Sequence, residues 1–141
     1  MRYHNPVVSG FYPDPSVCEA NGKFYLACSS FQYFPGVPLF ESEDLVNWKQ
    51  IGHVLTRKSQ VMLEKVASSG GVFAPTIRFH EGRFYMVTNN NTTSENFYVY
   101  TMAFTASGRS RSLSIRGASI RPCFSIRAMS ISSATDRMNT A

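Results

Sequence analysis

The sequence predicts an all-β protein built from repeated hairpins. Two stretches share one pattern: an opening tetrapeptide, a glycine eight positions after its first residue and a tyrosine eleven after it. The copies are Asp14-Pro15-Ser16-Val17 with Gly22-Lys23-Phe24-Tyr25, and Ala74-Pro75-Thr76-Ile77 with Gly82-Arg83-Phe84-Tyr85. Repetition at a fixed internal spacing indicates a modular architecture. The copies differ at their first residue, which is a carboxylate in one and Ala74 in the other.

Each repeat contains a predicted β-hairpin. In the first, residues 16–20 pair with 23–29 across Asn21-Gly22, a strong turn signal because both residues tolerate positive φ. In the second, residues 76–80 pair with 83–88 across Glu81-Gly82, a weaker signal. Aromatic and β-branched residues fill the second strand of each hairpin, as is typical of strands.

The remaining elements extend the β-structure. Residues 37–40 and 97–101 are predicted strands, and residues 43–48 form a polar bend that ends in Trp48. Short strands with a repeated hairpin favour a β-propeller, in which each blade is a small antiparallel sheet. An ordinary β-sandwich is the alternative.

Charge and aromatic content divide the chain near residue 104. Before Thr105 the eight basic and eight acidic residues balance, and 18 of the 19 aromatic residues lie there. After it, six arginines and one acid account for the whole net charge of +5. We therefore expect a folded part, 1–104, and an aberrant Ser/Arg-rich tail, 105–141. Because the tail lacks interleaved aromatic residues, a nucleic-acid partner is not expected.

The chain has no stretch apolar and long enough to span a membrane, and no apolar secretory signal near its N-terminus. Three cysteines give no disulfide framework. The Asn21-Gly22 turn places Cys18 opposite Tyr25 rather than opposite Cys28, so both thiols are expected to be buried and reduced. These features predict a cytoplasmic protein with no membrane partner.

The tail can be read in another frame. A shifted codon combines the last base of one residue's codon with the first two bases of the next residue's codon. Read in this way from Leu113, the tail can encode V-D-Q-G-G-I-D-P-S-L-F-F-D-Q-G-N-V-Y. This reading restores the aspartate, glycine and tyrosine spacing of the repeat. We therefore predict a single-base slip within residues 101–112, which the coding DNA would reveal through its third bases.

Longer stretches carry a family resemblance. They are residues 5–16 (NPVVSGFYPDPS), 29–38 (SSFQYFPGVP), 44–48 (DLVNW), 51–55 (IGHVL), 70–78 (GGVFAPTIR) and 82–85 (GRFY). Together they resemble glycoside hydrolase family 43, the β-xylosidase and α-L-arabinofuranosidase group, above all its xylosidase branch. The resemblance implies a five-bladed β-propeller, of which about the first two blades are present, and an inverting mechanism with three acidic residues.

The resemblance carries one catalytic residue over to this chain, Asp14 as the general base. The second aspartate would belong to the hidden third repeat, straddling Ser119 and Ile120, and the acid glutamate would lie beyond the sequence. Phe31, Phe73 and Ala74 match substrate-binding positions, and Phe73 stands where tryptophan is common. Some relatives hold a calcium ion, but no metal-ligand spacing occurs here, so no cofactor or metal is expected. A homo-oligomeric parent enzyme is compatible with the resemblance.

The residues themselves offer chemistry that suits this role. Inverting hydrolysis needs a base that holds a water on one side of the scissile bond. Pro13 and Pro15 flank Asp14 and are expected to hold it in an extended conformation. The alternative is that Asp14 only caps a turn. Phe31, Phe73, Tyr33 and Phe34 could line a sugar, although Phe34 is expected in the core.

Three functions follow in order of preference. The first is a glycosidase that releases terminal xylose or arabinose from xylan-derived oligosaccharides, inactive in this fragment alone. The second is a non-catalytic carbohydrate-binding module that keeps the aromatic wall. The third is a nucleic-acid binder, which would require salt-dependent binding through the tail.

Overall fold

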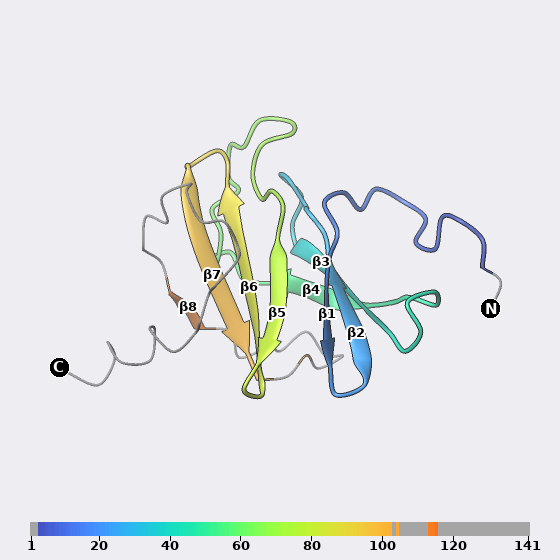
Figure 1. The fold of residues 1–141 in the computed structure, drawn as a ribbon. Coiled ribbons are helices and arrows are strands. Elements are labelled where there is room, and N and C mark those ends of the chain that lie inside the picture. Colours follow the sequence, from blue (N-terminus) through green and yellow to red (C-terminus); the bar gives the residue numbers. More distant parts are fainter. Residues whose placement is uncertain (1–2, 103, 105–112, 116–141) are drawn as a thin grey trace, which may run out of the picture.

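The computed structural model describes residues 3–102, 104 and 113–115, which form two antiparallel sheets (Figure 1). The first sheet has the order β1 (Ser16–Ala20), β2 (Lys23–Ala27), β3 (Gly36–Ser42) and β4 (Lys49–Leu55). The second has the order β5 (Thr76–His80), β6 (Arg83–Asn90), β7 (Glu95–Thr101) and β8 (Leu113–Ile115). Each strand pairs with its sequence neighbour, so the all-β prediction is confirmed.

The repeated hairpins have the same turn geometry. Asn21 and Gly22 have φ values of 54° and 76°, and Glu81 and Gly82 have 47° and 75°. Two consecutive positive φ values match the twist of a two-residue hairpin. The weaker Glu-Gly signal therefore gives the same turn as Asn-Gly. Sequence spacing, rather than the residue at the first turn position, predicted this equivalence.

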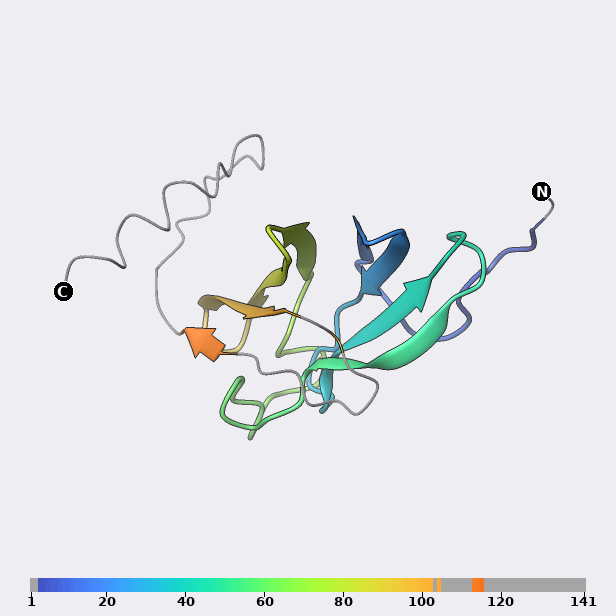
Figure 2. The ribbon, with the colours of Figure 1, turned by 90° about the horizontal axis from the view of Figure 1, so that it is seen from below.

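The sheets lie side by side, with β5 beside β1, as the two views show (Figures 1 and 2). The backbone N–H of Ile77 on β5 donates to Ser16 Oγ on β1 at 3.1 Å. The aromatic rings of Tyr25 and Phe84 meet edge to face, 4.8 Å apart, across the junction. One apolar core spans both sheets and includes Ala20, Leu39, Val54, Leu55, Val72, Ile77, Met86 and Val99.

The strand β4 was missing from the predicted elements. Its residues 49–55 combine polar side chains with Gly52, so they lack the alternation that marks a strand. In the structure β4 pairs with β3, and a shift of register between Leu39 and Phe40 absorbs the irregularity. Tertiary pairing therefore decides this element.

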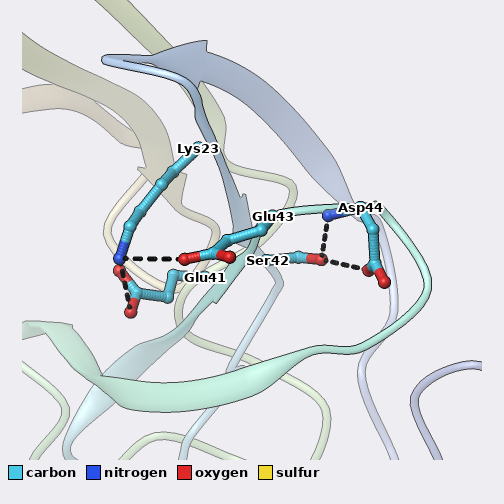
Figure 3. A network of polar contacts seen from close by, with 5 residues as sticks. All are labelled: Lys23, Glu41, Ser42, Glu43 and Asp44. Atoms are coloured by element: carbon cyan, nitrogen blue, oxygen red, sulfur yellow. Dashed lines mark hydrogen bonds and ion pairs between the residues drawn. The ribbon is translucent and has the colours of Figure 1, made fainter.

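The predicted polar bend connects β3 to β4. Asp44 accepts hydrogen bonds from the backbone N–H groups of Val46 and Asn47 at 2.9 and 2.7 Å. It also accepts one from Ser42 Oγ at 3.0 Å (Figure 3). These donors, Asn47 first, lower the pKa of the Asp44 carboxyl. The bend ends at Trp48, whose side chain packs on the first sheet against Leu26, Cys28 and Phe40.

A surface ion pair lies beside this bend. Lys23 Nζ is 3.3 Å from Glu41 Oε1 and 3.8 Å from Glu43 Oε1 (Figure 3). Solvent screens such exposed pairs, which typically contribute about 0–1 kcal/mol. The Asp44 turn, rather than this ion pair, is therefore the main polar support of the bend.

The two described cysteines are free and buried. Cys18 pairs with Tyr25 across the hairpin, as the turn predicted. Burial raises the pKa of the Cys18 and Cys28 thiols to about 11, with nearby charges as smaller causes. Neither thiol is therefore a reactive nucleophile near neutral pH.

The predictions for the tail fall mostly outside the described residues. Residues 105–112 and 116–141 are among those not described, so the domain boundary at 104 and the frame slip stay predictions. Within the described tail residues, β8 pairs with β7 through the Tyr98–Ile115, Val99–Ser114 and Tyr100–Leu113 positions. A search of the described residues finds no helix that could cross a lipid bilayer.

Candidate active site

Asp14 lies in the exposed turn that leads into β1. Its carboxylate oxygen Oδ2 accepts a hydrogen bond from the Ser29 hydroxyl at 2.6 Å. Ser29 is only 2% exposed, so its hydroxyl is fixed by the surrounding core. The Ser29 backbone N–H also donates to the Pro13 carbonyl at 2.9 Å. One buried serine therefore holds both the backbone and the side chain of the Asp14 turn.

The predicted extended conformation of Asp14 is wrong. Its φ is 53°, in the left-handed region that aspartate adopts more readily than most residues. The flanking prolines bias the local backbone, but the two Ser29 hydrogen bonds favour the turn. The carboxylate is therefore positioned by Ser29, two residues after β2, and not by the prolines alone.

The segment before Asp14 is anchored on the outer face of the first sheet. Tyr12 packs edge to face on Phe40, with ring centroids 4.9 Å apart. Val8 and Trp48 pack against the same cluster of Leu26, Cys28 and Phe40. Because Tyr12 faces the sheet, its neighbour Phe11 is left pointing to solvent, where it is 69% exposed.

Phe31 and Phe73 come together from the two repeats. Their ring centroids are 5.4 Å apart at an interplanar angle of 64°. The backbone of Phe31 pairs with that of Val72, with Phe31 N to Val72 O at 2.8 Å and Val72 N to Phe31 O at 3.0 Å. The predicted substrate-binding pair is therefore a real contact, although its binding role stays a prediction.

A glycine permits this contact between the sheets. Gly71 has a φ of +93°, and an added Cβ would lie 2.7 Å from the carbonyl carbon of Phe31 and overlap its oxygen. Only glycine fits such a close backbone approach without strain. The backbone N–H of Gly71 donates to Thr92 Oγ1 at 3.1 Å, which ties the segment before Phe73 to the connection between β6 and β7.

The other predicted residues occupy different surroundings. Ala74 is exposed just before β5, where it is the counterpart of Asp14 just before β1. Phe34 was expected in the core but is 44% exposed, so that expectation is wrong. Its segment, residues 32–35, runs over the surface between β2 and β3 rather than entering the apolar layer.

Two site residues escaped the sequence reasoning. Ser29 has no motif of its own, and only the folded chain brings it to Asp14. Phe11 looks like an ordinary apolar residue, yet its ring lies 5.8 Å from that of Phe31 at an angle of 32°. The sequence offered one indication of a role for Phe11, namely its position three residues before Asp14.

The arrangement can support general-base chemistry. Ser29 is the one hydrogen-bond partner of the Asp14 side chain among the described residues, and it binds Oδ2. Oδ1 can therefore accept a hydrogen bond from a water, as a general base requires. Half-buried aromatic side chains beside a few polar groups are typical of ligand sites. The described residues hold no cluster of three or more His, Cys, Asp or Glu suited to a metal ion.

Comparison with known proteins assigns the family. The sequence model for glycosyl hydrolases family 43 matches residues 3–109. The chain therefore belongs to glycoside hydrolase family 43.

Individual relatives agree with this assignment. The chain is 53% identical over 96 residues to a xylosidase/arabinosidase of Butyrivibrio fibrisolvens, a match covering 68% of this chain and 18% of the relative. It is 47% identical over 89 residues to a non-reducing end alpha-L-arabinofuranosidase of Bacteroides ovatus, covering 62% and 17%. This chain thus spans less than a fifth of the length of these curated relatives.

A solved structure is similar as well. A family 43 protein from a capybara gut metagenome matches with a TM-score of 0.71 and 40% identity, over 79% of this chain and 21% of that protein. This match over most of the chain is consistent with the family assignment.

Proposed function

We propose that this chain is part of a glycosidase that releases terminal xylose or arabinose from xylan-derived oligosaccharides by inversion, with Asp14 as the general base. The observation that carries the proposal is the Asp14 carboxylate, which Ser29 holds at the head of β1. The names of the two curated relatives, a xylosidase/arabinosidase and an arabinofuranosidase, support the substrate class. Phe31, Phe73 and Ala74 would contact the sugar.

The proposed architecture is a five-bladed β-propeller, of which the two sheets are the first two blades. Two features support it: the repeated hairpin and the side-by-side packing of β1 and β5, the first strand of each sheet. In a propeller the first strands of successive blades surround a central axis. Asp14 and Ala74 would then both face that axis, where the sugar binds.

The 141-residue chain is proposed to be inactive by itself. An inverting glycosidase needs a general acid about 6.5–9.5 Å from the base, across the scissile bond. Each such group contributes about 10²–10⁴-fold to the rate. This chain spans less than a fifth of the length of its curated relatives, and we propose that the general acid belongs to the remainder of the enzyme.

The test is turnover by the purified chain. Aryl β-D-xylopyranoside and aryl α-L-arabinofuranoside are supplied to the wild-type chain and to Asp14→Asn, and we expect no release above background from either. Turnover that disappears with Asp14→Asn would contradict the proposed inactivity. Turnover that persists in Asp14→Asn through repeated purification would contradict the role of Asp14.

A non-catalytic carbohydrate-binding role is the second candidate. It is favoured by the Phe31–Phe73 contact, which needs no second carboxylate to hold a sugar. Saturable binding of xylobiose that is unchanged in Asp14→Asn would favour this role over a catalytic origin. Binding that depends on Asp14 would favour the glycosidase site.

A further inference from the structure

Phe11, Phe31 and Phe73 form a continuous row of aromatic rings. The centroid distances are 5.8 Å between Phe11 and Phe31 and 5.4 Å between Phe31 and Phe73. Both distances lie within the range of favourable ring contacts. The row therefore crosses from the N-terminal segment through the first repeat to the loop before the second.

The two ends of the row have different geometry. Phe11 is inclined by only 32° to Phe31, whereas Phe73 stands at 64° to it. Phe11 and Phe31 thus make a shallow surface, and Phe73 meets that surface edge-on as a wall. The flat face of a ligand can lie on the Phe11–Phe31 surface, and the Phe73 ring limits how far the ligand extends along it.

The backbone holds Phe11 in this place. Tyr12 is packed on Phe40, and the Pro13 carbonyl accepts a hydrogen bond from Ser29 N. Gly10 has a φ of +129°, and an added Cβ would lie 2.7 Å from the Tyr12 ring. These contacts fix the chain on both sides of Phe11, so its ring is exposed without the segment being loose.

The same segment positions the Asp14 carboxylate. Only Tyr12 and Pro13 separate Phe11 from Asp14, and Phe31 lies two residues after Ser29, whose hydroxyl holds the carboxylate. A single exposed apolar residue needs no functional explanation. Phe11 differs because its ring continues the row of Phe31 and Phe73 and because it belongs to the segment that carries the proposed base.

We propose that Phe11 is a further sugar-contacting residue, beside Phe31, Phe73 and Ala74, which packs against the apolar face of a xylopyranose ring. The inference rests on the proposed pentose site. In the chair of β-xylose all hydroxyl groups are equatorial, so axial C–H bonds cover both ring faces. These C–H bonds meet the electron-rich faces of aromatic rings favourably.

An arabinofuranose ring fits this surface less well. It is a puckered five-membered ring with an exocyclic hydroxymethyl group, so it presents less flat C–H surface. Phe11 therefore contributes more to binding of a xylopyranoside than of an arabinofuranoside. The shallow Phe11–Phe31 surface thus favours the pyranose among the two proposed pentoses.

Another exposed aromatic residue provides a control. Tyr3 is 58% exposed, and among the described residues it takes no part in a ring contact with the row. Tyr3→Ala removes an aromatic side chain of similar size from another part of the surface. The comparison therefore separates a contact in the row from a general loss of apolar surface.

The experiment is titration of the 141-residue chain with xylobiose, followed by two-dimensional amide NMR. Phe11→Ala should weaken binding about tenfold, as expected for loss of a partly buried aromatic contact. Phe11→Trp, which keeps a ring face, and Tyr3→Ala should bind xylobiose within about twofold of wild type. The affinity for methyl α-L-arabinofuranoside should fall by less than about threefold in Phe11→Ala. Unchanged dispersion of the amide spectrum verifies that each variant is folded.

Each other outcome has a distinct meaning. If wild type binds xylobiose and Phe11→Ala binds it equally well, the role of Phe11 is wrong while the proposed function stands. If the wild-type chain shows no saturable chemical-shift changes with either sugar, the role of Phe11 and the proposed function are both wrong. Equal losses for the two sugars would overturn the preference for a pyranose.

Discussion

The two hairpins of this protein share a backbone and differ in chemistry. Both have two-residue turns with φ values that agree within 7°, and each is preceded by a residue followed by proline, Asp14-Pro15 or Ala74-Pro75. In the first, Asp14 has a buried serine to hold its carboxylate. In the second, the same position is Ala74, and the preceding loop supplies Phe73 and the close contact of Gly71 with Phe31. Two copies of one backbone motif can thus carry different groups: the first carries the Asp14 carboxylate, and the second carries the aromatic side chain of Phe73.

The largest effect on the free energy of unfolding is expected at Gly71, where the loop before the second repeat contacts the backbone of the first. Gly71→Ala would force a Cβ into the Phe31 carbonyl at a positive φ. We expect a loss of about 2–4 kcal/mol in the free energy of unfolding, from strain plus displacement of the contact. Urea denaturation measures this loss. A loss no greater than that of Gly22→Ala, which has open space around it, would show that the contact between the copies is not tight.

A smaller and equal effect is expected at the two hairpin turns. Gly22 and Gly82 have φ values of +76° and +75°, and an added Cβ would meet nothing within 4 Å at either position. Alanine at each should therefore cost about 1 kcal/mol, the usual penalty of a left-handed conformation. Paired denaturation curves for Gly22→Ala and Gly82→Ala test the equivalence. A difference greater than about 1 kcal/mol between them would break the structural symmetry of the copies.

The smallest effect is expected at the bend that only the first sheet contains. Asp44→Ala removes the acceptor for the Val46 and Asn47 N–H groups and should lower the Tm. Because these hydrogen bonds lower the pKa of Asp44, its contribution is complete above the unfolded pKa of about 4 and is lost as the pH falls toward the folded pKa. The Tm difference from wild type should therefore shrink in acid.

Glu43→Ala is the matched control for that experiment. Glu43 is the neighbouring acid, and its contact with Lys23 is a surface pair at 3.8 Å. It should change the Tm little at any pH. A pH-independent Tm difference for Asp44→Ala would contradict the role of its ionised carboxylate in the bend.

The sequence predicted the elements whose information is local. The Asn21-Gly22 turn determines its own conformation, and that turn places Cys18 opposite Tyr25. The repeat spacing extended the same prediction to Glu81-Gly82. By contrast, β4 has no apolar alternation, and its pairing with β3 depends on a shift of register that no local pattern encodes.

The candidate site divides in the same way. The motif around Asp14 singled out the residue, but not its left-handed φ, because Ser29 acts from 15 residues away. Phe34 was placed in the core from its apolar character, whereas the course of its loop leaves it exposed. Phe11 was overlooked because its exposure follows from the packing of Tyr12 on Phe40, a contact between distant segments.

The most direct measurement is a chimera in which residues 5–101 of this chain replace the matching segment of the Butyrivibrio fibrisolvens xylosidase/arabinosidase. We predict that the chimera hydrolyses an aryl β-D-xyloside and that Asp14→Asn lowers kcat by about 10²–10⁴-fold. Glu19→Gln, which changes another exposed acid on β1, should leave kcat within about threefold of the parent, as expected of a surface substitution. An active chimera whose kcat is unchanged by Asp14→Asn would contradict the assignment of Asp14 as the base.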